Sequence, residues 1–237
     1  MKRSIVLSIL CLAGAAGCSP PADAPARADE AAVSDWQRPP EVSAVTRQGA
    51  TLLVSGAAGP RARVVLRGVE GEAVASSAAA DGRFEIRLQA PAGDALLTLE
   101  VQSGEEAFTA PARLLVLRGG PVALLSEGQA AIRLDRAGPL DAVDSDGSAM
   151  VLSGRASTAP SVAMNGVALP VAFAKGRWRA EAPAGAGAIR VGSAAYDYPG
   201  PSGGAGFSTM RAGEGWSVAW SPQGGGGRQS TWLPDPS

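Results

Sequence analysis

The first candidate for a functional site is a short acidic stretch in the middle of the chain. Asp141, Asp144 and Asp146 lie close together and are followed by Gly147. Hard cations such as calcium bind several oxygen ligands, which closely spaced aspartates before a glycine can supply. The spacing does not fit the loop of an EF-hand, and no distal glutamate completes the ligand set. The aspartates are therefore weak metal candidates, and the favoured interpretation is a solvated linker that opens a second domain and binds no cofactor.

Tryptophans near the C-terminus form the second candidate site. Trp216, Val218 and Trp220 alternate onto one strand face, and after a glycine-rich turn Trp232 could pair back as a hairpin. Stacked tryptophan rings can bind sugars, so Trp216, Trp220 and Trp232 form a candidate ligand face for a glycan. The alternative is that these rings complete the core of a second domain whose repeated part ends too early to supply all its strands.

Composition excludes several function classes. The chain has no histidine, so it holds neither a Ser-His-Asp or Cys-His nucleophile system nor a histidine-ligated zinc site. Its 21 basic and 22 acidic residues give a net charge of −1, and no long basic cluster appears. This argues against binding to nucleic acid through a charged stripe. We expect a protein that is not an enzyme, with catalysis by a pair of carboxylates as the weaker alternative.

Cys18 follows a segment typical of secretory signals. Residues 1–17 begin with positive charges, continue with a short apolar run and end in small residues. The apolar run is too short to span a bilayer, which needs about 20 apolar residues. The stretch Ala15-Ala16-Gly17-Cys18 resembles the bacterial lipobox. This resemblance implies that residues 1–17 are a lipoprotein signal peptide and that Cys18 is lipidated, with palmitate among its acyl chains, as the first residue of the mature protein.

The resemblance also implies a location. Two or more acyl chains anchor a protein stably, whereas a single chain does not. Ser19 after the cysteine fits transfer to the outer membrane, so the lipid would hold the protein there on the periplasmic or the surface side. The alternative is a plain secreted thiol. In either case Cys11 leaves with the signal, and the mature chain cannot form an internal disulfide.

Residues 18–40 are rich in proline, alanine and charge and lack hydrophobic periodicity, which predicts a disordered tether between the anchor and the folded part. Trp36 is the exception in this segment. Two interpretations of it stay open: it packs onto the first folded domain, or it is an aromatic residue in a mobile linker.

Residues 41 onward show short apolar runs separated by glycine, proline, aspartate and asparagine. Phe84, Ile86 and Leu88 alternate with charged residues, as in a strand with one face on a core and one in water. Helical spacing is hard to find after residue 17. These patterns predict an all-β chain.

An internal repeat strengthens that prediction. Gly49–Gly56 (GATLLVSG) matches Gly147–Gly154 (GSAMVLSG) at an offset of 147 − 49 = 98 residues. A spacing near 100 residues is about the size of one β-sandwich. Later in each copy a glycine at a predicted hairpin turn is followed by an arginine and an inward aromatic residue, as in Gly82-Arg83-Phe84 and Gly176-Arg177-Trp178.

The order of V-S-G, R-V-V-L, D-G-R-F-E-I, A-P-A-G and L-T-L-E-V resembles the bacterial Ig-like and carboxypeptidase-regulatory-like sandwich modules. This resemblance covers about residues 41–118 well and residues 146–193 more loosely. It implies two Ig-like β-sandwiches in tandem, of the kind that act as spacers, stalks or binding units on exported proteins. The motifs specify fold far better than function.

The sequence therefore predicts an organisation and a role. Ig-like sandwiches are expected at residues 41–118 and 146–233, the second with a Trp-rich C-terminal hairpin. Residues 119–145 are expected to connect them, with a hairpin over residues 122–134. The expected function is that of a non-catalytic structural or protein-interaction module of the cell envelope. It would be held at the membrane through its N-terminal lipid and would meet other envelope proteins. The alternative is a carbohydrate- or peptidoglycan-binding lipoprotein that uses the C-terminal tryptophans.

Overall fold

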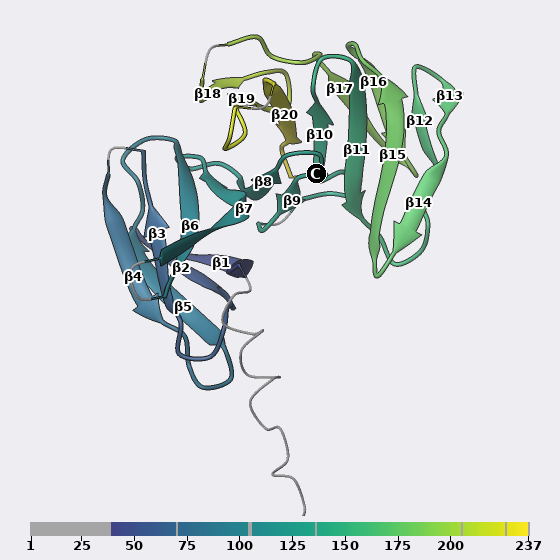
Figure 1. The fold of residues 1–237 in the computed structure, drawn as a ribbon. Helices are drawn as coiled ribbons and strands as arrows, with labels where there is room; N and C mark the ends of the chain where they lie inside the picture. Colours follow the sequence, from purple (N-terminus) through teal and green to yellow (C-terminus); the bar gives the residue numbers. More distant parts are fainter. Residues whose placement is uncertain are drawn as a thin grey trace, which may run out of the picture.

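The computed structural model describes residues 39–236 except 70, 104, 105, 136, 205 and 226. The predicted signal peptide, Cys18, the predicted tether before Pro39 and Trp36 lie outside the described residues. No helix occurs in the part of the chain that the structure describes, and the strands form four antiparallel sheets. The prediction of an all-β chain is confirmed, and the sheets pair into two β-sandwiches (Figure 1).

The first sandwich packs a three-stranded sheet against a six-stranded one. The smaller sheet has the order β1-β2-β5, made of β1 (Glu41–Gln48), β2 (Thr51–Ala57) and β5 (Arg83–Gln89). The larger sheet has the order β4-β3-β6-β7-β8-β9, made of β4 (Ala73–Ser77), β3 (Arg63–Arg67), β6 (Ala95–Ser103), β7 (Glu106–Val116), β8 (Val122–Ser126) and β9 (Ile132–Arg133). Alternate residues of the strands meet between the sheets, and Leu52, Val54, Ile86, Leu99 and Leu114 are all buried in this core.

The second sandwich is built from a seven-stranded and a four-stranded sheet. The larger sheet contains β14 (Val171–Ala174), β15 (Arg177–Pro183), β11 (Ala149–Arg155), β10 (Ala142–Ser145), β20 (Gln229–Pro234), β19 (Gly215–Trp220) and β18 (Ser208–Arg211), in that order. The smaller sheet contains β13 (Val167–Ala168), β12 (Val162–Met164), β16 (Gly187–Val191) and β17 (Ala194–Tyr198). Its core includes Leu152, Trp178, Ile189, Tyr198 and Trp232.

The two sandwiches repeat one connectivity. The orders β1-β2-β5 and β4-β3-β6-β7 of the first correspond to β10-β11-β15 and β13-β12-β16-β17 of the second. The first residues of β2 and β11 are 149 − 51 = 98 positions apart, the spacing of the sequence repeat. In both copies the fourth strand pairs with the third, whereas in constant-type immunoglobulin domains it joins the first two strands. The sequence repeat is therefore a repeat of strand order.

The repeated turns have the backbone that their residues predict. Gly82 and Gly176 have φ angles of 80° and 74°, in the left-handed region that glycine adopts without a steric penalty. Asn165 and Gly166 have φ angles of 50° and 82° and join β12 to β13. Positive φ at both central residues is what a tight asparagine-glycine hairpin requires.

Both copies also place a glycine under an aromatic ring. A Cβ atom on Gly56 would lie 2.6 Å from Cζ of Phe84, and one on Gly154 would lie 2.8 Å from Nε1 of Trp178. Real Cβ atoms do not approach other atoms so closely. The glycine that ends each V-S-G or L-S-G motif therefore leaves room for the aromatic ring of the Gly-Arg-Phe or Gly-Arg-Trp motif in the same copy. This contact explains why the two motifs recur together.

Residues 119–145 differ from the connecting segment that the sequence suggested. The hairpin predicted over residues 122–134 is present, since β8 pairs with β9, but these strands extend the large sheet of the first sandwich. Strand β10 already belongs to the second sandwich. The physical reason lies in β8, where Val122 and Leu124 face the first core while Leu125 faces the opposite way and is also buried. A strand buried on both faces cannot be a solvated linker.

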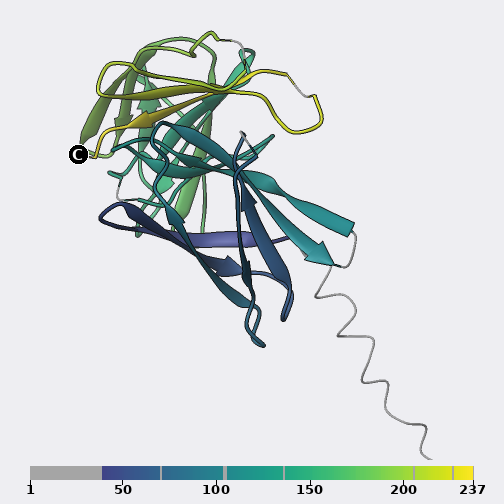
Figure 2. The same cartoon turned by 90° about the vertical axis from the view of Figure 1, so that its left-hand side faces the viewer.

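A third apolar cluster joins the two sandwiches. Residues from the outer face of β6, β7 and β8 meet residues from β10, β19 and β20, and Figure 2 shows the yellow C-terminal strands lying across the teal strands of the first sandwich. Its buried members are Leu96, Leu115, Leu117, Ala123, Leu125, Ala131, Ala142, Val218, Trp220 and Leu233. We call this cluster the joint. It holds the sandwiches together as an apolar core rather than through a linker.

Candidate functional site

Two of the three tryptophans proposed as a ligand face are buried. Trp220 is 3% exposed, lies in the joint and donates a hydrogen bond from Nε1 to Oγ1 of Thr231 at 3.1 Å. Trp232 is fully buried in the second core, where its ring meets that of Tyr198 edge-on at 5.6 Å between centroids. Neither ring offers a face to a ligand. Their burial favours the alternative that these residues complete a core.

Trp216 lies at the rim of the joint and is partly buried. The guanidinium of Arg211 sits 5.3 Å from the centroid of its ring, within the range of a cation–π interaction. The alternation predicted for β19 is present, because Trp216, Val218 and Trp220 all face the joint. This face is covered by the first sandwich, which the sequence of β19 alone could not reveal.

The three aspartates have separate structural partners. Asp146 accepts hydrogen bonds from the backbone N–H groups of Ser148 and Ala149 and from the Ser148 hydroxyl. These bonds lower the pKa of Asp146 to about 2, with the bond from Ala149 making the largest contribution. Asp146 thus holds the turn between β10 and β11, which Gly147 closes with a φ of 92°.

Asp141 is a buried carboxylate held by two arginines. Its side chain is 1% exposed and pairs with Nε of Arg155 at 3.2 Å and with Nη2 of Arg177 at 3.4 Å. Burial raises the pKa of Asp141, and the two guanidinium groups oppose that rise. Arg155 and Arg177 are direct cross-strand neighbours, so the carboxylate also separates two like charges.

Asp144 lies between the two sandwiches. Its carboxylate accepts hydrogen bonds from the N–H of Ala131, in the β8–β9 loop, and from Oγ1 of Thr231, each at 2.7 Å. Burial raises the pKa of Asp144 to about 6, against the lowering effect of these two bonds. Within the described residues, no three histidine, cysteine, aspartate or glutamate side chains gather closely enough to hold a metal ion.

An arginine that the sequence analysis did not single out links the two sandwiches beside the joint. Arg133 of β9 is fully buried and makes a bidentate pair with Asp135, at 2.8 and 2.6 Å. Its third bond runs to the carbonyl of Pro234 in β20, 101 positions away. Arg155 donates to the Arg133 carbonyl from the other sandwich. The i, i+2 pair Arg133 and Asp135 beside an apolar strand was the available sequence signal, but its partners are distant in sequence.

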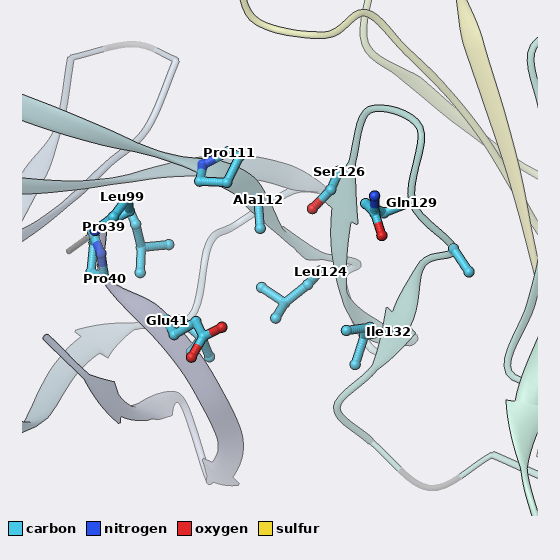
Figure 3. Close-up of a pocket in the computed structure, with 12 residues that line it drawn as sticks. Pro39, Pro40, Glu41, Leu99, Pro111, Ala112, Leu124, Ser126, Gln129 and Ile132 are labelled. Carbon is cyan, nitrogen blue, oxygen red and sulfur yellow. The ribbon is translucent and has the colours of Figure 1, made fainter. Parts of the chain in front are cut away.

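An apolar groove lies beside β1 in the first sandwich. Its cavity is about 620 Å³, and Figure 3 shows Leu124 near its centre, with Pro39 and Pro40 at one end and Ile132 at the other. Pro111 forms part of its wall where β7 shifts register against β6. A proline cannot donate to a strand ladder, which accounts for a bulge at this position. We call this hollow the β1 groove.

No protein-family model matches this chain, and no curated protein matches it. None of the residues that the structure describes belongs to a helix that could span a membrane.

Proposed function

We propose that this chain is a non-catalytic lipoprotein of the cell envelope, anchored in the outer membrane through a lipidated Cys18. Its two sandwiches would serve as one rigid structural or protein-interaction module on the periplasmic or surface side. The lipobox-like sequence before Cys18 supports the anchor, and the two β-sandwiches in tandem agree with the resemblance to exported Ig-like modules.

One observation carries the functional part of the proposal. Three of the residues that suggested a site from their types have structural roles: Trp220 and Asp144 lie where the two sandwiches meet, and Trp232 completes the second core. A joint of this kind fixes the orientation of the two sandwiches, which is what a spacer or scaffold needs. Glycan binding through the C-terminal tryptophans would need exposed rings, and we do not propose it.

The anchor is tested by cell fractionation. The unmodified protein should sediment with the outer membrane, and mass spectrometry should find acyl chains on its N-terminus. Cys18→Ser should move the protein to the soluble fraction. Ser19→Asp is the matched control: it leaves the cysteine in place and should keep the protein on a membrane. A Cys18→Ser protein that still sediments with the membrane would contradict the anchor.

The choice between a scaffold and a glycan-binding protein is tested by sedimentation with purified peptidoglycan. We expect no retention of the soluble Cys18→Ser protein. Retention that is lost in Trp216→Ala, with the fold intact by circular dichroism, would overturn the proposal. Trp216 is chosen because it is the most accessible of the three rings, whereas replacing Trp220 or Trp232 would damage a core.

A further inference from the structure

The equivalent strands β1 and β10 of the two sandwiches differ in how many neighbours they pair with. Strand β10 is paired on both sides, with β11 and with β20, and β20 inserts Trp232 into the core beside it. Its counterpart β1 is paired with β2 alone among the described strands. The β1 groove lies on this free side. The first sandwich thus has an apolar hollow on the side where the second has a strand carrying a tryptophan.

The groove is suited to an aromatic side chain. Its lining is mostly apolar, with Leu99, Ala112, Leu124 and Ile132 from four strands of the large sheet. Its volume of about 620 Å³ is well above the roughly 150 Å³ of an apolar cavity that binds benzene. An apolar wall that stays in contact with water lacks the favourable free energy that burial against another apolar group would give.

The chain itself enters the first sandwich at this groove. Pro39 and Pro40, the first described residues, form one end of its wall (Figure 3). Trp36 precedes Pro39 by three residues, a reach of at most about 10 Å. It is the only aromatic residue in the first 38 positions. Ser34-Asp35-Trp36 also matches Ser230-Thr231-Trp232 of β20 in its serine and tryptophan.

We propose that the segment of residues 31–38 docks in the β1 groove of its own chain, with the Trp36 ring against Leu124 and Ile132. It fills for the first sandwich the role that β20 fills for the second. The end of the segment that joins β1 is then part of the folded unit, and the tether to the anchor is correspondingly shorter. The inference does not depend on lipidation, because it concerns only the segment and the groove.

The test places a fluorine probe on each tryptophan. The Cys18→Ser protein, purified from the soluble fraction and labelled with 5-fluorotryptophan, should give five ¹⁹F resonances, and Trp36→Phe identifies the one from Trp36. We expect this resonance to be displaced from that of free 5-fluorotryptophan and to lack the solvent isotope shift of an exposed ring in D₂O. This measurement needs no change in the groove. A free-like, fully solvent-shifted Trp36 resonance would overturn the proposal.

Two further variants separate the groove from other surfaces. Ser126 lines the groove, and Ser126→Phe should fill it and move the Trp36 resonance toward the free position. Ser77→Phe is the matched control on β4, at the opposite end of the same sheet, and should leave the resonance in place. The other four resonances report whether each variant is folded. If Ser126→Phe does not fold, Ile132→Ala replaces it and should give a smaller displacement in the same direction. A Trp36 resonance that changes with protein concentration would indicate insertion into a second copy and would overturn docking within one chain.

Discussion

The first and second sandwiches share a strand order but are completed by different parts of the chain. The first adds β8 and β9 to its large sheet, so the added strands follow the repeat directly. The second adds β14 beside β15 and adds β18, β19 and β20 beside β10, and β20, the strand that pairs with β10, begins 229 − 145 = 84 residues after β10 ends. The additions differ in sequence and position, yet both contribute a face to the joint.

This difference separates two kinds of constraint. The repeated strands carry the constraints of a sandwich: alternating core residues, hairpin glycines and a glycine beneath an aromatic ring. The added strands carry a second requirement, because β8, β19 and β20 must contact a second apolar surface. As a result, the adjacent strands β19 and β20 carry tryptophans together with polar residues that are also buried. These polar residues are Ser217, Ser230 and Thr231. The joint is therefore built from these added strands together with the outer faces of the repeated strands β6, β7 and β10.

We expect the largest effect from removing Trp232. The added strand β20 supplies this ring to the second sandwich, and no described strand supplies an equivalent ring to the first. Trp232→Ala deletes a fully buried ring and leaves a cavity, which costs about 3–5 kcal/mol of the free energy of unfolding. It also leaves the Ala212 carbonyl without its donor. Urea denaturation measures the loss, and hydrogen exchange should show that amides of β15 lose more protection than those of β5. Equal losses in both strands would contradict the assignment of Trp232 to the second core.

An intermediate and matched pair of effects is expected at the repeated glycines. Gly56→Ala and Gly154→Ala each force a methyl group against an aromatic ring and a backbone carbonyl, so each should lower the free energy of unfolding by about 1–3 kcal/mol. Gly93→Ala is the control, because no atom lies within 4 Å of a Cβ built there, and it should be close to neutral. Thermal denaturation of the three proteins compares them. A neutral Gly154→Ala beside a destabilising Gly56→Ala would show that the two copies are not equivalent at this position.

The smallest effect concerns pH and the joint. The folded-state pKa of Asp144, about 6, lies above its unfolded value of 3.8, so the folded state holds the proton more tightly. The contribution of Asp144 to stability is therefore fully present below about pH 4 and is lost as the pH rises through 6. Asp144→Asn removes this titration. We expect the free energy of unfolding of Asp144→Asn, relative to that of the unmodified protein, to rise by about 1–2 kcal/mol as the pH increases from 4 to 7. Urea denaturation across this range measures the gain.

Asp146→Asn is the control of opposite sign for that experiment. Its hydrogen bonds lower the folded-state pKa to about 2, so its contribution is present above pH 4 and is lost as the pH falls toward 2. The Asp146→Asn protein should therefore lose stability relative to the unmodified protein at neutral pH. An Asp144→Asn protein with the same pH dependence as the unmodified one would contradict burial of this carboxylate in the joint.

Much of the fold could be predicted from local patterns. The alternation in β5, the matched motifs 98 residues apart and the asparagine-glycine turn each depend on neighbouring residues, and each is confirmed. The candidate residues were less predictable. The alternation of Trp216 and Trp220 indicated one shared face but could not say whether water, a sugar or another sandwich covers it. For Asp144 the deciding partner, the Ala131 amide, lies in the other sandwich.

The class of the fold, its repeat and its turns are predictable from the amino-acid sequence alone, because they follow from backbone geometry and from the period of apolar residues along a single strand. The contacts of the outer faces of β6, β7, β8 and β19 become visible only in the folded structure. A strand with apolar residues on both faces needs two partners, and the pattern does not identify them. Arg133 and Pro234 meet across 101 positions through a buried hydrogen bond, a contact that exists only once both sandwiches are folded against each other.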